Sequence, residues 1–353
     1  MTESVRMSDT ASVNYLDPQT LAAIGPIDLR ARMIVEGLMA GMHRSPYQGF
    51  SVEFAQHRQY APGDDLRFLD WKVYGRTDKL YLKQYQKETN LDLLIMVDAS
   101  GSMGYSSDVR RGRPGWRKYD HAASVAAALA YLALRQRDRV AVVLFADELH
   151  SETSMSNARD HWRTIVETLS SETFDEAPHP TSRRHKPQGT RTEGQPPTPR
   201  LNSSQSTNYR LQSRGTDLGK LFDQVAARLR QRSLLVLLSD LFDSPEALER
   251  GLARFHHHRH DVMVLQTLDH AELEFPFRTP SDFFGLEDEG RVGLDPAAIR
   301  QAYLEALNRH LRRVEQLTRR FRFDYLLLDS SQPLSPPLSH FLARRAAMIK
   351  MRK

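Results

Sequence analysis

Five stretches of the chain are apolar almost throughout, without the polar residue at every second position that a half-exposed strand shows. They cover residues 91–97, 139–145, 233–239, 262–268 and 323–328. Strands of this kind are typical of a parallel sheet that is covered on both faces. Stretches with helical periodicity alternate with them at 118–136, 158–171, 217–231, 245–258 and 296–320. This alternation predicts an α/β fold with a doubly wound, mostly parallel sheet over residues 91–330.

The N-terminal part has a different pattern. In residues 1–44, Asp28 is a candidate cap for a helix in which apolar residues recur near helical spacing. Residues 45–90 predict a small β-rich unit, with alternation from Phe50 to Phe54, a turn at 62–64 and a returning strand at 80–82.

Three further segments complete the predicted organisation. Residues 172–214 are rich in Pro, Ser, Thr, Gln and Arg and nearly lack aliphatic residues, which predicts a disordered insertion. Residues 271–294 predict an ordered excursion with a short hairpin or loop, and residues 331–353 predict a C-terminal helix.

Composition narrows the class of protein. The 353 residues are 40% hydrophobic and 26% charged, which is globular composition. The absence of cysteine excludes disulfides, thiolate catalysis and cysteine-ligated metals. The N-terminus lacks an apolar targeting segment, and the alanine-rich run at 122–134 is shorter than the roughly 20 residues of a spanning helix. We therefore expect a cytoplasmic protein without a membrane span. The net charge of +5 is spread along the chain and is a weak indication of an anionic partner.

Candidate chemistry begins where the first sheet strand ends. Asp98, Ser100 and Ser102 follow this strand, at the edge where open α/β sheets bind ligands. One carboxylate and two hydroxyls suit a hard divalent cation, most of all Mg²⁺, with Mn²⁺ or Ca²⁺ as alternatives. Thr216, which opens a helix, and Asp240, which ends another strand, are candidates for the remaining ligands. The alternative interpretation is structural, with the aspartates in turns and Thr216 as a helix cap.

The order D-x-S-x-S, then T, then D resembles the metal-ion-dependent adhesion site of the von Willebrand factor A fold. The resemblance implies that both serines and Thr216 ligate the cation directly or through water. It also implies that Asp98 and Asp240 hold the cation either directly or by contacting its direct ligands. It also implies that a carboxylate from a binding partner completes the coordination.

A second resemblance covers roughly residues 45–345. The chain is similar to the bacterial family catalogued as domain of unknown function 58, whose hallmark run is R-x-Y-x-P-G-D-D-x-R-x-x-D-W. The matching residues are Arg58, Tyr60, Pro62, Gly63, Asp64, Asp65, Arg67, Asp70 and Trp71. Such proteins are typically encoded beside MoxR-type AAA+ ATPases, which implies an adaptor that acts with such an ATPase in chaperone-like maturation or stress responses. We interpret the hallmark run as structural, with charge pairs around a turn and Trp71 packed against the sheet.

The leading hypothesis is thus a non-enzymatic binding module, and two enzymatic alternatives remain. In a serine hydrolase Ser102 would be the nucleophile and His270 the base, although Ser100 stands where the G-x-S-x-G turn needs glycine. In a phosphatase Asp98 would be the nucleophile, but such sites need a second carboxylate two residues later and a lysine farther along the sheet.

Three binding classes are less favoured. The histidines of 255–261 could bind a transition metal and the arginines of 309–322 could bind nucleic acid, but both segments also suit solvated helix surfaces. The chain has no P-loop and is not itself a P-loop ATPase.

Overall fold

The centre of the molecule is a six-stranded sheet. The structure is a computed structural model that describes residues 18–43, 57–60, 71–83, 91–110, 113–146, 148–174, 218–229, 231–279, 281–284 and 291–351. The strands are β3 (Asp92–Asp98), β6 (Arg139–Phe145), β7 (Leu149–Glu152), β8 (Leu234–Ser239), β9 (Asp261–Leu268) and β12 (Asp324–Asp329). Their order is β12-β9-β8-β3-β6-β7, and all pairs are parallel except β6 with β7. The prediction of an α/β fold with a mostly parallel sheet is confirmed.

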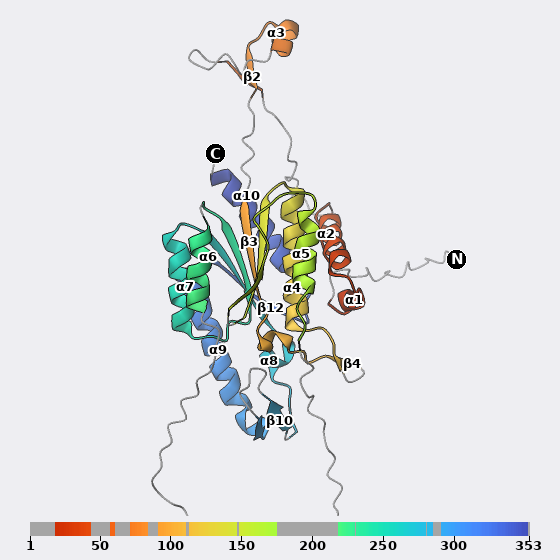
Figure 1. Cartoon of the computed structure of the whole chain (residues 1–353), viewed down its shortest axis with the longest axis vertical. Coiled ribbons are helices and arrows are strands. Elements are labelled where there is room, and N and C mark those ends of the chain that lie inside the picture. Colours follow the sequence, from red (N-terminus) through yellow and green to blue (C-terminus); the bar gives the residue numbers. More distant parts are fainter. Residues whose placement is uncertain are drawn as a thin grey trace, which may run out of the picture.

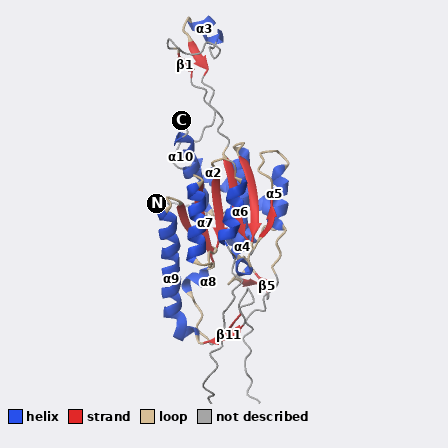
Figure 2. Cartoon of the chain, turned by 60° about the vertical axis from the view of Figure 1, so that its left-hand side comes forward, coloured by secondary structure: helices blue, strands red, loops and turns tan. Residues whose placement is uncertain are grey.

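Helices cover both faces of this sheet (Figures 1 and 2). One face is covered by α2 (Ile27–His43), α4 (Lys118–Arg135), α5 (His161–Ser170) and α10 (Ser335–Met351), and the other by α6 (Leu218–Arg228), α7 (Pro245–His257) and α9 (Pro296–Arg320). Along β3, Leu93 and Ile95 belong to the first core, whereas Leu94 and Met96 belong to the second. Both sides of the strand are therefore buried, which explains why its sequence shows no polar alternation.

Helix α4 lies in the middle of the first core. It contacts β3 and β6 on the sheet side, and α2, α5 and α10 pack against it as well. Its alanines are buried, with exposed fractions of 2% or less from Ala122 to Ala130. Small side chains let several elements approach one helix closely, so the alanine-rich stretch is a packing feature of a buried core helix.

The N-terminal predictions need two corrections. Helix α2 begins at Ile27, so Asp28 lies in its first turn and does not cap it, and a short helix α1 (Pro18–Ala22) precedes it. The β-rich unit does contain an antiparallel pair, β1 (His57–Gln59) with β2 (Tyr81–Lys83), but helix α3 (Trp71–Thr77) lies between them in sequence.

Trp71 does not pack against the sheet as predicted. It is 66% exposed and makes an edge-to-face contact with the Tyr74 ring on α3, with ring centroids 6.1 Å apart. The rest of the hallmark run between 61 and 70, and the strand expected at 50–54, lie outside the described residues.

The excursion after β9 contains a five-residue helix, α8 (His270–Glu274), and the antiparallel hairpin of β10 (Ser281–Phe284) and β11 (Arg291–Leu294). The hairpin is as predicted. A smaller pair, β4 (Val109–Arg110) with β5 (Arg113–Pro114), precedes α4. Most of the insertion at 172–214 lies outside the described residues.

Candidate metal centre

The site is built where two neighbouring strands end. Strands β3 and β8 are parallel, with Val97 paired to Leu238, so their carboxyl ends open at the same edge of the sheet. Asp98 is the last residue of β3, and Asp240 directly follows β8. Both are buried, with exposed fractions of 4% and 3%. The Ser239 hydroxyl donates to Asp98 Oδ2 at 2.5 Å, which ties the end of β8 to the end of β3.

The two serines link these aspartates through a chain of hydrogen bonds. The Ser100 backbone N–H donates to Asp98 Oδ1 at 2.8 Å. The hydroxyl oxygens of Ser100 and Ser102 lie 3.1 Å apart, and the Ser102 hydroxyl donates to Asp240 Oδ2 at 2.7 Å. Ser102 sits in a 3₁₀ turn, Gly101–Gly104, that folds the chain back over the strand ends. Four of the five predicted residues therefore lie in one connected set.

The fifth predicted residue, Thr216, lies outside the described residues. Helix α6, which it was predicted to open, is described from Leu218 onward. Its participation stays a prediction.

The sequence did not predict the lysine whose ammonium the structure places among these residues. Lys118, at the start of α4, is 0% exposed, and its ammonium donates to Asp240 Oδ2 at 2.9 Å and to Glu272 Oε1 at 2.8 Å. Glu272 belongs to α8, so three elements meet at this ammonium. One signal was available: Lys118 directly precedes the apolar, alanine-rich run at 122–134, and a lysine that is buried with such a run needs a charged partner.

The charges of the set perturb one another. Burial, and after it the nearby Asp240 carboxylate, raise the pKa of Asp98 to about 7, against the hydrogen bonds from Ser239 and Ser100. Burial lowers the pKa of Lys118, but the carboxylates of Asp240 and Glu272 outweigh it, so the net direction is upward and the ammonium stays protonated. Burial likewise raises the pKa of Glu272, and Lys118 opposes that rise. The set is electrostatically strained around Asp98, which a nearby divalent cation would relieve.

An exposed aromatic ring borders the site. Leu241 adopts a left-handed backbone conformation with φ of 57°, which is costly for a bulky residue and is found mostly where surrounding structure enforces it. The next residue, Phe242, is 48% exposed, and the Lys118 ammonium lies 5.3 Å from the centre of its ring. The Phe242 ring also lies beside His310 of α9, with 5.8 Å between the ring centroids.

The donor set decides which metals fit. In the described part of the chain, no group of three or more His, Cys, Asp and Glu side chains is arranged to hold a metal ion. A cation at the strand ends would therefore depend on the hydroxyls of Ser100 and Ser102 together with carboxylate oxygens. This all-oxygen set fits Mg²⁺, Mn²⁺ or Ca²⁺ and does not fit zinc or copper.

The groups needed by a serine hydrolase have other partners. The Ser102 hydroxyl donates to Asp240, whereas His270 Nδ1 pairs with Asp329 Oδ2 at 2.9 Å. The hairpin of β4 and β5 separates the serine turn from α4, so the turn does not enter a helix directly as a nucleophile elbow does. For the phosphatase alternative, Lys118 supplies a lysine at the site. Ser100, however, occupies the position where such a site needs its second carboxylate.

The less favoured segments have structural roles. The His256 ring packs 5.7 Å from the Phe321 ring, and His260 Nδ1 accepts a hydrogen bond from the Ser233 backbone N–H. On α9, Leu307 and Val314 are buried while the arginines at 309, 312, 313, 319 and 320 are exposed. This matches the solvated helix face that the sequence favours.

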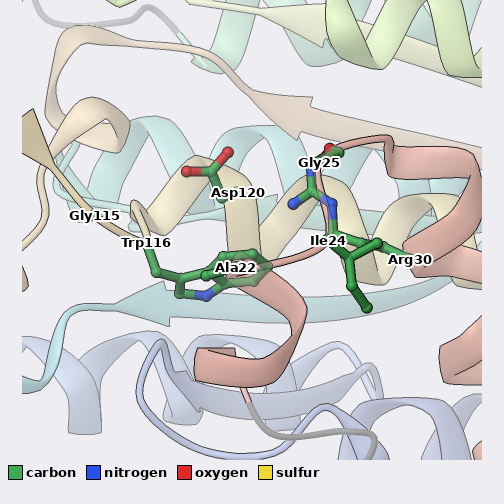
Figure 3. Close-up of a pocket in the computed structure, with 7 residues that line it drawn as sticks. All are labelled: Ala22, Ile24, Gly25, Arg30, Gly115, Trp116 and Asp120. Carbon is green, nitrogen blue, oxygen red and sulfur yellow. Dashed lines mark hydrogen bonds between the residues drawn. The ribbon is translucent and has the colours of Figure 1, made fainter. Parts of the chain in front are cut away.

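A cavity of about 270 Å³ lies on another side of α4 (Figure 3). Its polar lining includes Arg30 of α2 and Asp120 of α4, and the Arg30 guanidinium lies 5.4 Å from the centre of the Trp116 ring. Arg30 also donates to Ser124 at 3.3 Å. Asp120 and Lys118 are two positions apart and so diverge by about 200° around the helix. The cavity is therefore part of the α2–α4 contact and separate from the strand ends.

Comparisons with known proteins place the chain among uncharacterised relatives. The model of the family described as "Protein of unknown function DUF58" matches residues 56–313. Uncharacterized proteins of Mycobacterium tuberculosis (strain H37Rv) and Mycobacterium bovis are each 25% identical over 262 residues, which is 74% of this chain and 68% of the relative.

Among solved structures, the conserved hypothetical protein BatB from Bacteroides thetaiotaomicron is 14% identical with a TM-score of 0.38, covering 73% of this chain and 99% of BatB. An aerotolerance-related membrane protein from Bacteroides fragilis is 16% identical with a TM-score of 0.34, covering 68% and 92%. Likeness at these scores transfers no function. In the regions that the structure describes, no helix is long and apolar enough to cross a membrane.

Proposed function

Because the chain belongs to the DUF58 family of proteins of unknown function, we propose a role for its strand-end site: the protein is a cation-dependent protein-binding module. The observation that carries the proposal is the connected set of Asp98, Ser100, Ser102 and Asp240 at the carboxyl ends of β3 and β8. Two hydroxyls and two carboxylates gathered at a sheet edge suit capture of a hard divalent cation, most of all Mg²⁺.

The finer assignment is a von Willebrand factor A-type sheet with a metal-ion-dependent adhesion site. The D-x-S-x-S turn after a buried central strand and the aspartate after the adjacent strand support it, with Thr216 as the remaining ligand. In such a site the cation keeps an open position that an incoming carboxylate fills. A partner bound in this way needs further contacts, and the half-exposed Phe242 ring beside the site supplies an apolar anchor.

The partner we propose is a MoxR-type AAA+ ATPase or its client protein, with the chain acting as an adaptor in chaperone-like maturation or stress responses. The family resemblance supports this partner. A binding role is favoured over catalysis because Ser102 donates to the Asp240 carboxylate, whereas His270, the base of the hydrolase alternative, pairs with Asp329.

Phosphoryl transfer is the second candidate, and the buried Lys118 ammonium is the observation that favours it. Asp98 would be the nucleophile. Its burial at 4% exposure and its hydrogen bonds from Ser239 and Ser100 argue against attack on a substrate. Mg²⁺-dependent phosphatase turnover that disappears in Asp98→Asn would favour this candidate over the binding module.

A pull-down tests the proposed function. The purified protein is mixed with a MoxR-type AAA+ ATPase from the same organism, in Mg²⁺ with ATP, and again in EDTA. Asp98→Ala, Ser102→Ala and EDTA are each expected to abolish co-purification. Asp223→Ala is the matched control, because Asp223 is an exposed carboxylate on α6 that pairs only with an exposed arginine in the described contacts. Circular dichroism confirms that each variant is folded, and binding that survives both EDTA and Asp98→Ala would sink the metal-face interface.

A further inference from the structure

Lys118 brings a fixed positive charge to the candidate metal centre. Its ammonium and the Ser102 hydroxyl donate to the same oxygen, Asp240 Oδ2, at 2.9 and 2.7 Å. A single carboxylate oxygen therefore separates the ammonium from a hydroxyl that would ligate the cation. A metal ion ligated by this hydroxyl would lie close to the Lys118 ammonium, and in a buried environment two positive charges at such a distance repel each other strongly.

The ammonium is held in place from several sides. Glu272 Oε1 accepts its second ion pair at 2.8 Å, and the Phe242 ring lies over it at 5.3 Å. The Lys118 backbone N–H donates to the Tyr105 carbonyl at 3.1 Å, which fixes the start of α4 beside the serine turn. With the side chain 0% exposed, the charge cannot swing into water when a metal ion arrives.

We propose that Lys118 is a resident counter-cation that weakens divalent-cation binding at the Asp98–Ser100–Ser102–Asp240 site. The inference rests on the proposed function, since it concerns the affinity of that same site. The ammonium neutralises Asp240 without a metal ion, and it repels a divalent cation that approaches the serine hydroxyls. The site consequently binds its cation weakly until a partner carboxylate adds negative charge on the open side.

Glu272 has the opposite effect on cation affinity, and it acts from farther away than Lys118. Its carboxylate lies beyond the ammonium and compensates part of the repulsion. Removing the charge of Lys118 should therefore tighten cation binding, and removing the charge of Glu272 should loosen it. A merely structural ion pair would lower cation affinity, through distortion of the site, whichever partner was removed.

The experiment is a Mn²⁺ titration of the full chain without any partner protein, with free Mn²⁺ followed by electron paramagnetic resonance. Lys118→Met, which keeps most of the side-chain volume, is expected to bind Mn²⁺ at least about tenfold more tightly than the unmodified chain. Glu272→Gln leaves Lys118 paired with Asp240 and is expected to bind several-fold more weakly. Lys118→Met leaves the buried Asp240 and the half-buried Glu272 without a counter-charge. The double variant Lys118→Met/Glu272→Gln is therefore the substitute if the single variant does not fold, and it too should bind more tightly.

Two failures are distinguishable. If the unmodified chain binds Mn²⁺ and loses it in Asp98→Ala, while neither Lys118→Met nor the double variant binds more tightly, the counter-cation role is wrong and the metal site stands. If none of the folded variants binds Mn²⁺, the proposed metal-dependent function is itself wrong, and this inference falls with it.

Discussion

The stability of the fold should depend on pH through one buried histidine. His121, on α4, is 1% exposed, and its Nδ1 accepts a hydrogen bond from Trp116 Nε1 at 3.3 Å. A backbone hydrogen bond joins it to Ser330, after β12, and the Asp329 carboxylate is the charge that acts on it. His121 thus links α4 to the far edge strand of the sheet in its neutral form.

Burial lowers the pKa of His121, and because Asp329 and Ser330 offset only part of this effect, the pKa falls from 6.5 to about 4. Between these two values the unfolded chain binds more protons than the folded one. The stabilisation is therefore complete above pH 6.5 and is lost as pH falls towards 4. At about 1.4 kcal/mol per pKa unit, the loss is roughly 2 kcal/mol by pH 5 and roughly 3 kcal/mol over the whole window.

The assay is urea unfolding followed by far-ultraviolet circular dichroism at several pH values from 7.5 to 5. The perturbation is His121→Asn, which offers an oxygen near the position of Nδ1 to accept from Trp116 and does not titrate in this range. The variant is expected to be less stable at pH 7.5, and its free energy of unfolding should fall by roughly 2 kcal/mol less than that of the unmodified chain on going to pH 5. The same substitution at the exposed His257 of α7, His257→Asn, is the control for the chemical change itself.

Parallel pH profiles for the unmodified chain and His121→Asn would refute the reasoning. They would mean that the imidazole has the same proton affinity in the folded and unfolded chains.

Two other predictions concern packing and recognition. Gly251→Ala should lower the free energy of unfolding by about 1–3 kcal/mol, because the added Cβ would lie 1.8 Å from Cδ2 of the buried Phe222. Thermal unfolding measures this loss. Gly75→Ala, whose new Cβ meets nothing within 4 Å, should show no such loss. Phe242→Ser should weaken binding of the AAA+ partner at least about tenfold, as expected for an aromatic anchor, and should leave the melting temperature nearly unchanged because the ring is 48% exposed. An unchanged dissociation constant would remove Phe242 from the interface.

The sheet was predictable because its central strands, β3, β6, β8 and β9, are buried on both faces. Each of the five predicted strands is continuous and apolar, and this pattern depends only on local sequence. Strand β7 escaped prediction because it has only four residues, Leu149–Glu152, which alternate between half-buried and exposed and gain their place only by pairing with β6. Trp71 was misplaced for a related reason: an aromatic residue in sequence indicates burial on average, but nothing local says what covers it.

Most of the candidate site could be predicted from the same apolar pattern as the sheet. The ends of β3 and β8 follow from the apolar pattern, and a parallel sheet brings such ends to one edge, so Asp98, Ser100, Ser102 and Asp240 could be grouped without coordinates. Lys118 could not be assigned in this way, since its partners come from β8 and from α8, a helix of only five residues that no periodicity reveals.

The ammonium changes what the site is chemically. From the sequence, the strand ends form a partial cage of oxygens that requires a metal ion to balance its aspartates. With Lys118 in the fold, Asp240 is already compensated, and only Asp98, whose pKa is raised to about 7 by burial and by Asp240, lacks a cationic partner among the described residues. A divalent cation would therefore be recruited chiefly through Asp98 and the serine hydroxyls. The charge of Lys118 would then set how strongly the loaded site attracts the carboxylate of a partner.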